Sequence, residues 1–279
     1  MPTFNQNRTF GVEIEFFGVS YHKVVSALRE KGVSVHHEHY NHSTRRHWKL
    51  VYDISVTSRG TEQRGGNEIV SPILKGKRGL QELKLVLDTL DEIGARVDRT
   101  CGLYVHHAAN DFTVGNFKNA YAMYYKFENF FDAVVAPSRR QSVNQYCRGI
   151  SKEQIEALAE ARNVYEVGQV FSSRYCKLNV QAFFRHGTLE FRQHGGTVNS
   201  DKAVNWVIFT QAIMERARGE AVRISKGEHN RDAVDNFNHE RRLRRTLFGA
   251  VTKETLENEL GQAFKFQMSR RKHFESRVA

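Results

Sequence analysis

Arg8-Thr-Phe-Gly-Val-Glu-Ile-Glu-Phe-Phe17 is the stretch from which the fold of this chain can be worked out. Its apolar and polar side chains alternate, and this period of two residues predicts a β-strand. On such a strand Glu13 and Glu15 project from one face, roughly 7 Å apart by the strand rise. Neighbouring carboxylates repel each other, and a divalent cation between them would offset that repulsion. A solvated acidic face on an edge strand is an equally good interpretation of this stretch alone.

The composition indicates a sizeable core and an excess of positive charge. The chain has 279 residues, of which 40% are hydrophobic and 26% charged, and its formal net charge is +11. This length allows one large domain or two small ones. Only three prolines and no glycine–serine run are present, which favours one compact domain over residues 1–219 with a basic helical extension over residues 220–279. The positive charge indicates anionic partners, such as nucleic acid, nucleotide phosphates or carboxylated substrates.

Cysteine usage and hydropathy bear on the compartment. Cys101, Cys147 and Cys176 show no CxxC spacing, which favours reduced thiols and a cytoplasmic location. The sequence contains neither the apolar segment of a signal peptide nor a long apolar span. Secretion by a signal peptide and insertion into a membrane are therefore not expected.

Later segments are predicted to add strands and helices around the first strand. Alternation predicts strands at residues 48–56, 67–72 and 95–109, and a hairpin whose arms are residues 177–184 and 188–194. Apolar spacing and capping signals predict helices at residues 20–32, 79–94, 117–136, 151–164 and 200–218.

Charged and imidazole side chains on these strands could meet at one site. They are Glu13, Glu15, Asp53, Glu68, His106 and Glu190, accompanied by the cations Arg174, Lys177 and Arg192. Carboxylates with one imidazole and no thiolate suit Mg²⁺ or Mn²⁺ better than structural zinc. Divalent ions beside arginines and lysines are what phosphoryl transfer needs. Because the chain has no Walker A sequence, a nucleotide site would have to be built from sheet carboxylates and metal.

Five histidines lie between His36 and His47. Zinc sites usually combine histidines with cysteines or show an HExxH sequence, and neither occurs here. We interpret this segment as a solvated loop that binds metal weakly.

Five motifs, taken in chain order, resemble those of the amidoligase family, a branch of the glutamine synthetase and glutamate–cysteine ligase superfamily. They are Gly11-Val-Glu-Ile-Glu15, Trp48 with Asp53-x-Ser55, Glu68-Ile-Val-Ser-Pro72, Cys101-Gly-Leu-Tyr-Val-His106 and Gly187-Thr-Leu-Glu-Phe-Arg192. Each motif is weak alone, but the ordered set is specific and covers roughly residues 8–210. The resemblance implies an α+β, glutamine synthetase-like catalytic fold. In that fold a curved, mainly antiparallel sheet is backed by helices, and its concave face binds ATP and divalent metals.

The resemblance also implies metal ligands, carried over position by position. Glu13, His106 and Glu190 would hold the metal that grips the ATP phosphates. Glu15 and Glu68 would hold the metal that meets the substrate carboxylate.

Further roles follow from the same resemblance. Arg192 would stabilise the γ-phosphate during its transfer. Asp53 would sit beside the incoming amine and orient or deprotonate it. Arg174, Lys177 and Asn179 match the residues that enter the family's hairpin, which suggests contacts with the nucleotide.

One position departs from the family pattern. The family usually has His-x-His after Cys-Gly, and here the first of these positions is Tyr104. A neutral phenol can donate a hydrogen bond to phosphate, but it is a poor ligand for Mg²⁺. Either His106 suffices alone, or activity is altered, or the chain binds its ligands without turning them over.

The function implied is that of an ATP-dependent carboxylate–amine ligase, which makes an amide through an acyl-phosphate intermediate. Two alternatives come from other classes. A metal-dependent hydrolase such as a nuclease would also use clustered carboxylates, but no Asp/Glu-x-Lys strand motif is evident. A nucleic-acid-binding protein would explain the calculated pI of about 9.6, yet it gives no reason for acidic residues on three strands. The sequence leaves open which carboxylate and amine are joined and what oligomer forms.

Overall fold

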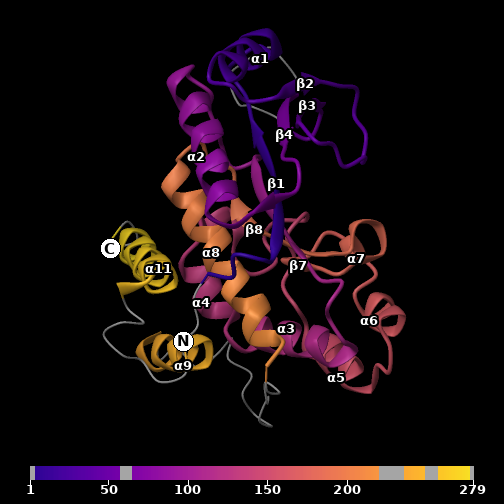
Figure 1. The fold of residues 1–279 in the computed structure, drawn as a ribbon. Helices are drawn as coiled ribbons and strands as arrows, with labels where there is room; N and C mark the ends of the chain where they lie inside the picture. The colour runs from indigo at the N-terminus through magenta and orange to yellow at the C-terminus, as the bar shows by residue number, and fades with distance from the viewer. Residues whose placement is uncertain (1–3, 57–64, 220–235, 249–256, 277–279) are drawn as a thin grey trace. The chain divides into compact units, whose positions relative to one another are not determined.

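The computed structural model describes residues 4–56, 65–219, 236–248 and 257–276, and Figure 1 labels its helices and strands. By their internal contacts these residues form two compact units. We call Gln6–His106 with His194–Val204 the sheet unit, and Met1–Asn5 with His107–Gln193 and Asn205–Ala279 the helical unit. Each unit is described by itself.

The sheet unit contains the predicted first strand and the elements that follow it up to residue 106. Its strands follow the order β2-β3-β4-β1-β6, and β5 pairs with β1. The pairs β1–β4, β1–β5 and β3–β4 are antiparallel, whereas β2–β3 is parallel. The elements are β1 (Thr9–Phe16), α1 (Tyr21–Glu30), β2 (Val35–His37), β3 (Trp48–Asp53), β4 (Gly66–Val70), β5 (Leu74–Lys75), α2 (Gly76–Glu92) and β6 (Gly102–Ala108).

The strand register brings acidic residues of three strands to one face of this sheet. Glu15 on β1 lies opposite Glu68 on β4, and Val51 on β3 also lies opposite Glu68. Residues opposite each other share a face, and so do alternate residues of one strand. Glu13 and Asp53 therefore lie on the same face as the Glu15–Glu68 pair.

Local signals in the sequence explain how α1 begins and ends. The hydroxyl of Ser20 accepts a hydrogen bond of 3.3 Å from the Lys23 N–H, which caps the helix as predicted. Val24 and Leu28 are buried one turn apart. Gly32 follows the helix with φ of +80°, a left-handed conformation that glycine adopts without strain.

The helical unit contains most of the helices and a short strand pair. The antiparallel pair β7–β8 places Asn179 opposite Glu190. The elements β6, β8 and α8 each continue across the division between the units. The elements are α3 (Val114–Lys126), α4 (Glu128–Ala133), the 3-10 helix η1 (Pro137–Arg139), α5 (Lys152–Glu160), α6 (Val164–Val170), β7 (Leu178–Asn179), α7 (Gln181–His186), β8 (Thr188–Gly195), α8 (Ser200–Ala217), α9 (Asn236–Phe248) and α11 (Glu259–Glu275).

Aromatic side chains form much of the core of the helical unit. Tyr121 stacks on Phe171 with ring centroids 3.8 Å apart. Phe130 of α4 stacks on Phe264 of α11 at 5.8 Å, and Phe248 of α9 meets Phe264 edge-on at 5.5 Å. The two C-terminal helices therefore pack against this core. The predicted domain boundary after residue 219 adjoins residues 220–235, which lie outside the described ranges, and it stays a prediction.

The mainly antiparallel sheet with helices confirms the expected α+β class, but two predicted elements were wrong. The predicted helix over residues 117–136 is interrupted at Phe127, which lies between α3 and α4. Its φ of −112° and ψ of 18° are not helical. The first hairpin arm is a strand only at Leu178–Asn179 and is followed by α7. The Asn179 side chain accepts a 2.8 Å hydrogen bond from the Gln181 N–H. This Asx turn ends the strand and starts the helix.

Two predicted boundaries were also too generous. The strand expected over residues 95–109 begins only at Gly102, because Asp98 accepts a 2.8 Å hydrogen bond from the Thr100 N–H and forms a turn. The helix that begins with the Ser151 capping box ends at residue 160, and a separate helix starts at residue 164. None of the helices in the described ranges combines the length and the apolar character that crossing a membrane requires.

Candidate functional site

Three carboxylates of the sheet unit meet on the acidic face of its sheet. One carboxylate oxygen each of Glu15, Asp53 and Glu68 lies within 4.8 Å of the other two. They come from the neighbouring strands β1, β3 and β4, so the sheet itself positions them. Glu15 and Glu68 are buried, and Asp53 is half-buried. We call these three residues the carboxylate cluster.

Glu15 is held by hydrogen bonds to both of its oxygens. The Tyr104 hydroxyl donates to Oε1 at 2.8 Å. The Gly102 backbone N–H donates to Oε2 at 2.5 Å. Both donors belong to β6, the strand beside β1. Two hydrogen bonds of this kind fix the orientation of the carboxylate group.

The acidity of Glu68 is strongly perturbed. Burial raises the pKa of Glu68 well above its ordinary value, and the nearby Glu13, Glu15 and Asp53 carboxylates raise it further. The positive charge of Lys49 acts in the opposite direction. Burial and the repulsion between neighbouring carboxylates thus both disfavour the ionised form of Glu68, and a cation would act in the opposite direction.

Lys49 is a charged residue of this face that the sequence analysis did not single out. It lies four residues before Asp53 on β3, so both project from the same face. Its buried Nζ donates to the Asn41 backbone oxygen at 2.6 Å and lies 3.4 Å from that of Ser43. Burial lowers the pKa of Lys49, whereas the Glu13 and other nearby carboxylates raise it. The even spacing of Lys49 and Asp53 was the signal in the sequence that could have identified it.

The histidine-rich segment wraps around the half-buried carboxylate of Glu38. Glu38 accepts hydrogen bonds from Asn41 at 2.9 Å and Arg45 at 3.1 Å, and His47 Nε2 lies 2.7 Å from its Oε1. Burial opposes the effect, but these contacts lower the pKa of Glu38 to about 2. Among the described residues, no histidine of this segment belongs to a group spaced for metal binding. The segment instead supplies the carbonyl groups that hold Lys49.

Apart from the carboxylate cluster, Glu13 and His106 lie close together within the sheet unit. His106 Nε2 lies 3.4 Å from Glu13 Oε1, and both side chains are half-buried. The predicted third ligand of this metal, Glu190, belongs to the helical unit, as does Arg192. The combination of these four residues in one site stays a prediction.

Within the helical unit, three predicted residues meet on the β7–β8 pair. Asn179 Nδ2 donates to Glu190 Oε2 at 2.5 Å, and Arg192 Nη1 donates to Glu190 Oε1 at 2.5 Å. All three side chains are buried. The carboxylate of Glu190 is therefore oriented by an amide and neutralised by a guanidinium group.

Lys177 and Arg174 are placed differently from these three residues. The fully buried Lys177 ammonium lies 2.7 Å from Glu128 and 2.6 Å from Asp132 on α4. These ion pairs commit it to the core of the helical unit. Arg174 is exposed, and its guanidinium carbon lies 5.0 Å from the centre of the Tyr175 ring. A role of either residue in binding the nucleotide stays a prediction.

A comparison with protein families decides the class of the chain. The model of a family described as "Putative amidoligase enzyme" matches residues 6–214. The chain belongs to the amidoligase family. This membership confirms the resemblance of the five motifs and places the protein among the ligases. Comparison with curated proteins gave no match.

The fold of this amidoligase was also compared with solved structures. A structure described as "Apo GmaS without ligand" is similar over 97% of this chain and 70% of that chain. The sequence identity is 11% and the TM-score is 0.37.

The carboxylate cluster of the amidoligase fits a divalent cation. It offers three oxygen donors within 4.8 Å of one another and no sulfur or nitrogen ligand. Such a donor set suits the hard ions Mg²⁺ and Mn²⁺. A cation would also relieve the repulsion that raises the pKa of Glu68. Asp53, to which the resemblance assigned the amine, belongs to this donor set by its position.

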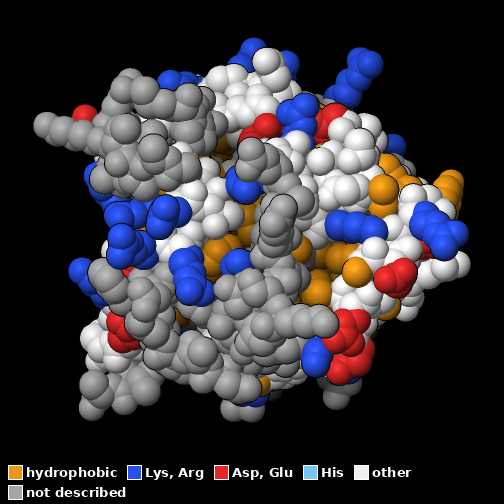
Figure 2. Space-filling view, turned by 90° about the horizontal axis from the view of Figure 1, so that it is seen from below, with side chains coloured by type: hydrophobic (Ala, Val, Ile, Leu, Met, Phe, Trp, Pro, Cys, Tyr) orange, Lys and Arg blue, Asp and Glu red, His pale blue; other side chains and the backbone are white. Residues whose placement is uncertain are grey.

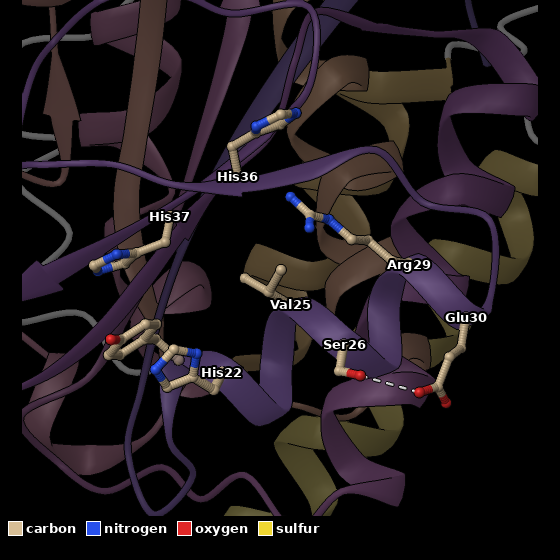
Figure 3. A pocket seen from close by; sticks show the side chains of 8 residues that line it. His22, Val25, Ser26, Arg29, Glu30, His36 and His37 are labelled. Carbon is tan, nitrogen blue, oxygen red and sulfur yellow. Dashed lines mark hydrogen bonds between the residues drawn. The ribbon is translucent and has the colours of Figure 1, made fainter.

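The amidoligase also has an open groove between α1 and β2, shown in Figure 3. Its volume is about 730 Å³, and none of the carboxylate cluster lines it. The Tyr21 ring packs between its histidines, 4.0 Å from the His22 ring and 4.2 Å from the His37 ring. His36 projects to the other side of the strand in Figure 3. The His22 and His37 imidazoles thus pack against a phenol, and the His36 ring packs against His47.

Proposed function

We propose that this amidoligase joins a carboxylate to an amine at the expense of ATP, with the carboxylate cluster as the centre of its active site. The observation that carries the proposal is the convergence of Glu15, Asp53 and Glu68 on one face of the sheet. Three carboxylates that repel one another are costly to bury, and a bound cation would offset this cost.

The reaction needs an activated carboxylate. A free carboxylate is a poor electrophile, because its charge is delocalised and an amine cannot expel oxide. A carboxylate oxygen first attacks the γ-phosphorus of ATP, the bond from this phosphorus to the β–γ bridging oxygen breaks, and ADP leaves. The amine nitrogen then attacks the carbonyl carbon of the acyl phosphate. The bond to the phosphate oxygen breaks, inorganic phosphate leaves, and the amine gives a proton to a base.

The cluster would hold Mg²⁺ or Mn²⁺. When bound, such an ion neutralises the oxygens of phosphate and carboxylate groups that would otherwise repel each other. The protein's part is to keep the two anionic substrates aligned and shielded from water. Asp53 is half-buried and is the candidate for contact with the amine, as the resemblance implies.

Further roles are proposed from the family motifs. Glu13, His106 and Glu190 would bind the metal that meets the ATP phosphates, and Arg192 would face the γ-phosphate as it is transferred. Support within each unit comes from the Glu13–His106 contact of 3.4 Å and from the buried Glu190–Arg192 pair. Guanidinium groups in such positions stabilise the charge that develops during phosphoryl transfer.

The charge of the protein suits anionic substrates. On the face shown in Figure 2, Lys and Arg side chains are more widespread than Asp and Glu side chains. Together with the net charge of +11, this supports a nucleotide and a carboxylated molecule as partners. The three cysteines are free, which supports the proposal that the enzyme works in the cytoplasm.

Hydroxylamine trapping tests the proposal without knowledge of the natural amine. The full-length protein is incubated with ATP, Mg²⁺, hydroxylamine and a set of amino acids and peptides with free γ- or α-carboxylates. We expect formation of ADP and of a hydroxamate with one class of carboxylate, both dependent on Mg²⁺. Glu68→Gln should abolish both products, whereas Glu92→Gln, which changes an exposed glutamate of the same unit, should keep them. Metal-dependent cleavage of DNA or RNA without ATP, and no hydroxamate, would contradict the proposal and favour a nuclease.

A further inference from the structure

Within the described residues, Glu15 is the member of the carboxylate cluster that has a hydrogen-bond donor on each oxygen. The Tyr104 hydroxyl lies 2.8 Å from Oε1 and the Gly102 nitrogen 2.5 Å from Oε2. We propose that Tyr104 is a positioning residue that orients Glu15 for a divalent cation. This inference rests on the proposed function, because it presumes that the cluster binds the cation.

Tyr104 makes a specific contact with the cluster. Its side chain is buried, and its hydroxyl hydrogen is directed to Glu15. A neutral phenol is a poor metal ligand but a good hydrogen-bond donor. A carboxylate oxygen has two lone pairs, so it can accept a hydrogen bond and face a cation at the same time. Glu15 thus enters the cluster with an orientation fixed by two donors.

The backbone at Gly102 is shaped to fit this arrangement. A Cβ atom at this position would overlap the aromatic ring of Tyr104. The absence of a side chain lets the ring lie over residue 102 while the N–H of the same residue reaches Glu15. Tyr104 and Gly102 of β6 therefore act together to restrain the Glu15 carboxylate.

Restraint matters because the cluster is repulsive. Glu15 faces Glu68 directly across the β1–β4 pair, and like charges in this position destabilise a sheet. A ligand that is already oriented loses less conformational entropy when the ion binds. Residues that orient metal ligands typically change metal affinity by about 10–100-fold when they are replaced.

Manganese affinity, measured by electron paramagnetic resonance of free Mn²⁺, tests the inference on the full-length protein. Tyr104→Phe keeps the ring and removes the hydroxyl, and we expect it to weaken Mn²⁺ binding by about 10-fold or more. The matched control is Tyr124→Phe, which removes the hydroxyl of another buried tyrosine, one that donates to Gln193 in the helical unit. This control should leave Mn²⁺ affinity unchanged. The unfolding midpoint of each variant in EDTA reports any general loss of stability.

A double-mutant cycle separates positioning from a structural role. If Tyr104 acts through Glu15, Tyr104→Phe should have no further effect on Mn²⁺ affinity in a Glu15→Gln background. Additive losses would overturn the inference, and so would an unchanged affinity in Tyr104→Phe alone, while both results leave the ligase proposal standing. If the unmodified protein binds no Mn²⁺, the inference and the metal site of the proposed function fail together.

Discussion

Glu15 on β1 and Glu68 on β4 lie directly opposite each other in an antiparallel strand pair, and both side chains are buried. Like charges in this position destabilise a sheet, and burial adds a cost of desolvation. A proton or a divalent cation relieves this repulsion. Without a cation, the repulsion between these residues is therefore expected to lower the free energy of unfolding, and this loss can be measured.

Glu68→Gln should stabilise the protein when no metal is present. The folded-state pKa of Glu68 is raised, first by burial and then by the neighbouring carboxylates. Its contribution to stability is therefore complete below the unfolded pKa and is lost as the pH rises through the folded pKa. In EDTA we expect the unmodified protein to lose stability between pH 5 and pH 8, and Glu68→Gln to lose less, a difference on the order of 1 kcal/mol. Urea unfolding at both pH values measures it. A parallel loss in the two proteins would show that Glu68 does not titrate in this range.

Divalent metal should reverse this order. At about a hundred times its dissociation constant, Mg²⁺ or Mn²⁺ should stabilise the unmodified protein by roughly 2.7 kcal/mol. Asp53→Asn and Glu68→Gln should lose most of this gain, because each removes a charged ligand of the cluster. Glu92→Gln should retain it, since Glu92 is exposed and paired with Lys31. Thermal unfolding with and without the ion is the measurement, and equal shifts in all four proteins would place the cation elsewhere.

Lys49→Met should loosen the histidine-rich segment. The Lys49 ammonium donates hydrogen bonds to the backbone oxygens of Asn41 and Ser43. Its loss leaves these carbonyls without their donor, and we expect a cost of about 1–3 kcal/mol. Hydrogen exchange of residues 38–47 should become faster. Lys31→Met, which removes an exposed ion pair, should change stability by less than about 1 kcal/mol. Unaltered exchange in Lys49→Met would mean that the segment is held by other contacts.

Lys177→Met distinguishes a structural lysine from one that binds the nucleotide. The variant leaves Glu128 and Asp132 buried without their cation, which should cost about 3–5 kcal/mol of unfolding free energy. A lysine that serves only the nucleotide would instead raise the KM for ATP and leave stability unchanged. Urea unfolding and ATP-dependent activity together decide between these roles. Lys152→Met, at an exposed ion pair of the same unit, serves as the control.

Glu13→Gln should impair catalysis much more than folding. Glu13 is half-buried and lies 3.4 Å from His106, so its removal should change stability by no more than about 1 kcal/mol. The proposed role at the ATP phosphates predicts a fall in turnover of about 10²–10³-fold. Hydroxamate formation per unit time measures it. Full activity in this variant would remove Glu13 from the site.

Short-range patterns predicted strand and helix starts in both units and failed where distant residues intervene. The first strand, the Ser20 cap and the capping box of Ser151 with Gln154 were correct, because each depends on residues within a few positions. The strand expected after residue 179 became α7, since the Asn179 and Gln181 side chains bond to the local backbone and to Gly168. Such a choice depends on a contact 13 residues away in the chain, which periodicity does not contain.

By itself, the sequence determined that Glu13 and Glu15 share one face of a strand, and its ordered motifs identified the amidoligase family. Tertiary structure alone decided that Asp53 joins Glu15 and Glu68 and that Lys177 is enclosed by acidic residues of α4. Only the fold showed that Tyr104, which departs from the family pattern, donates to Glu15. The physical reason is the separation along the chain of the residues that interact. Alternation and capping follow from bonds between neighbours in the chain, whereas burial and charge depend on which strands and helices are brought together.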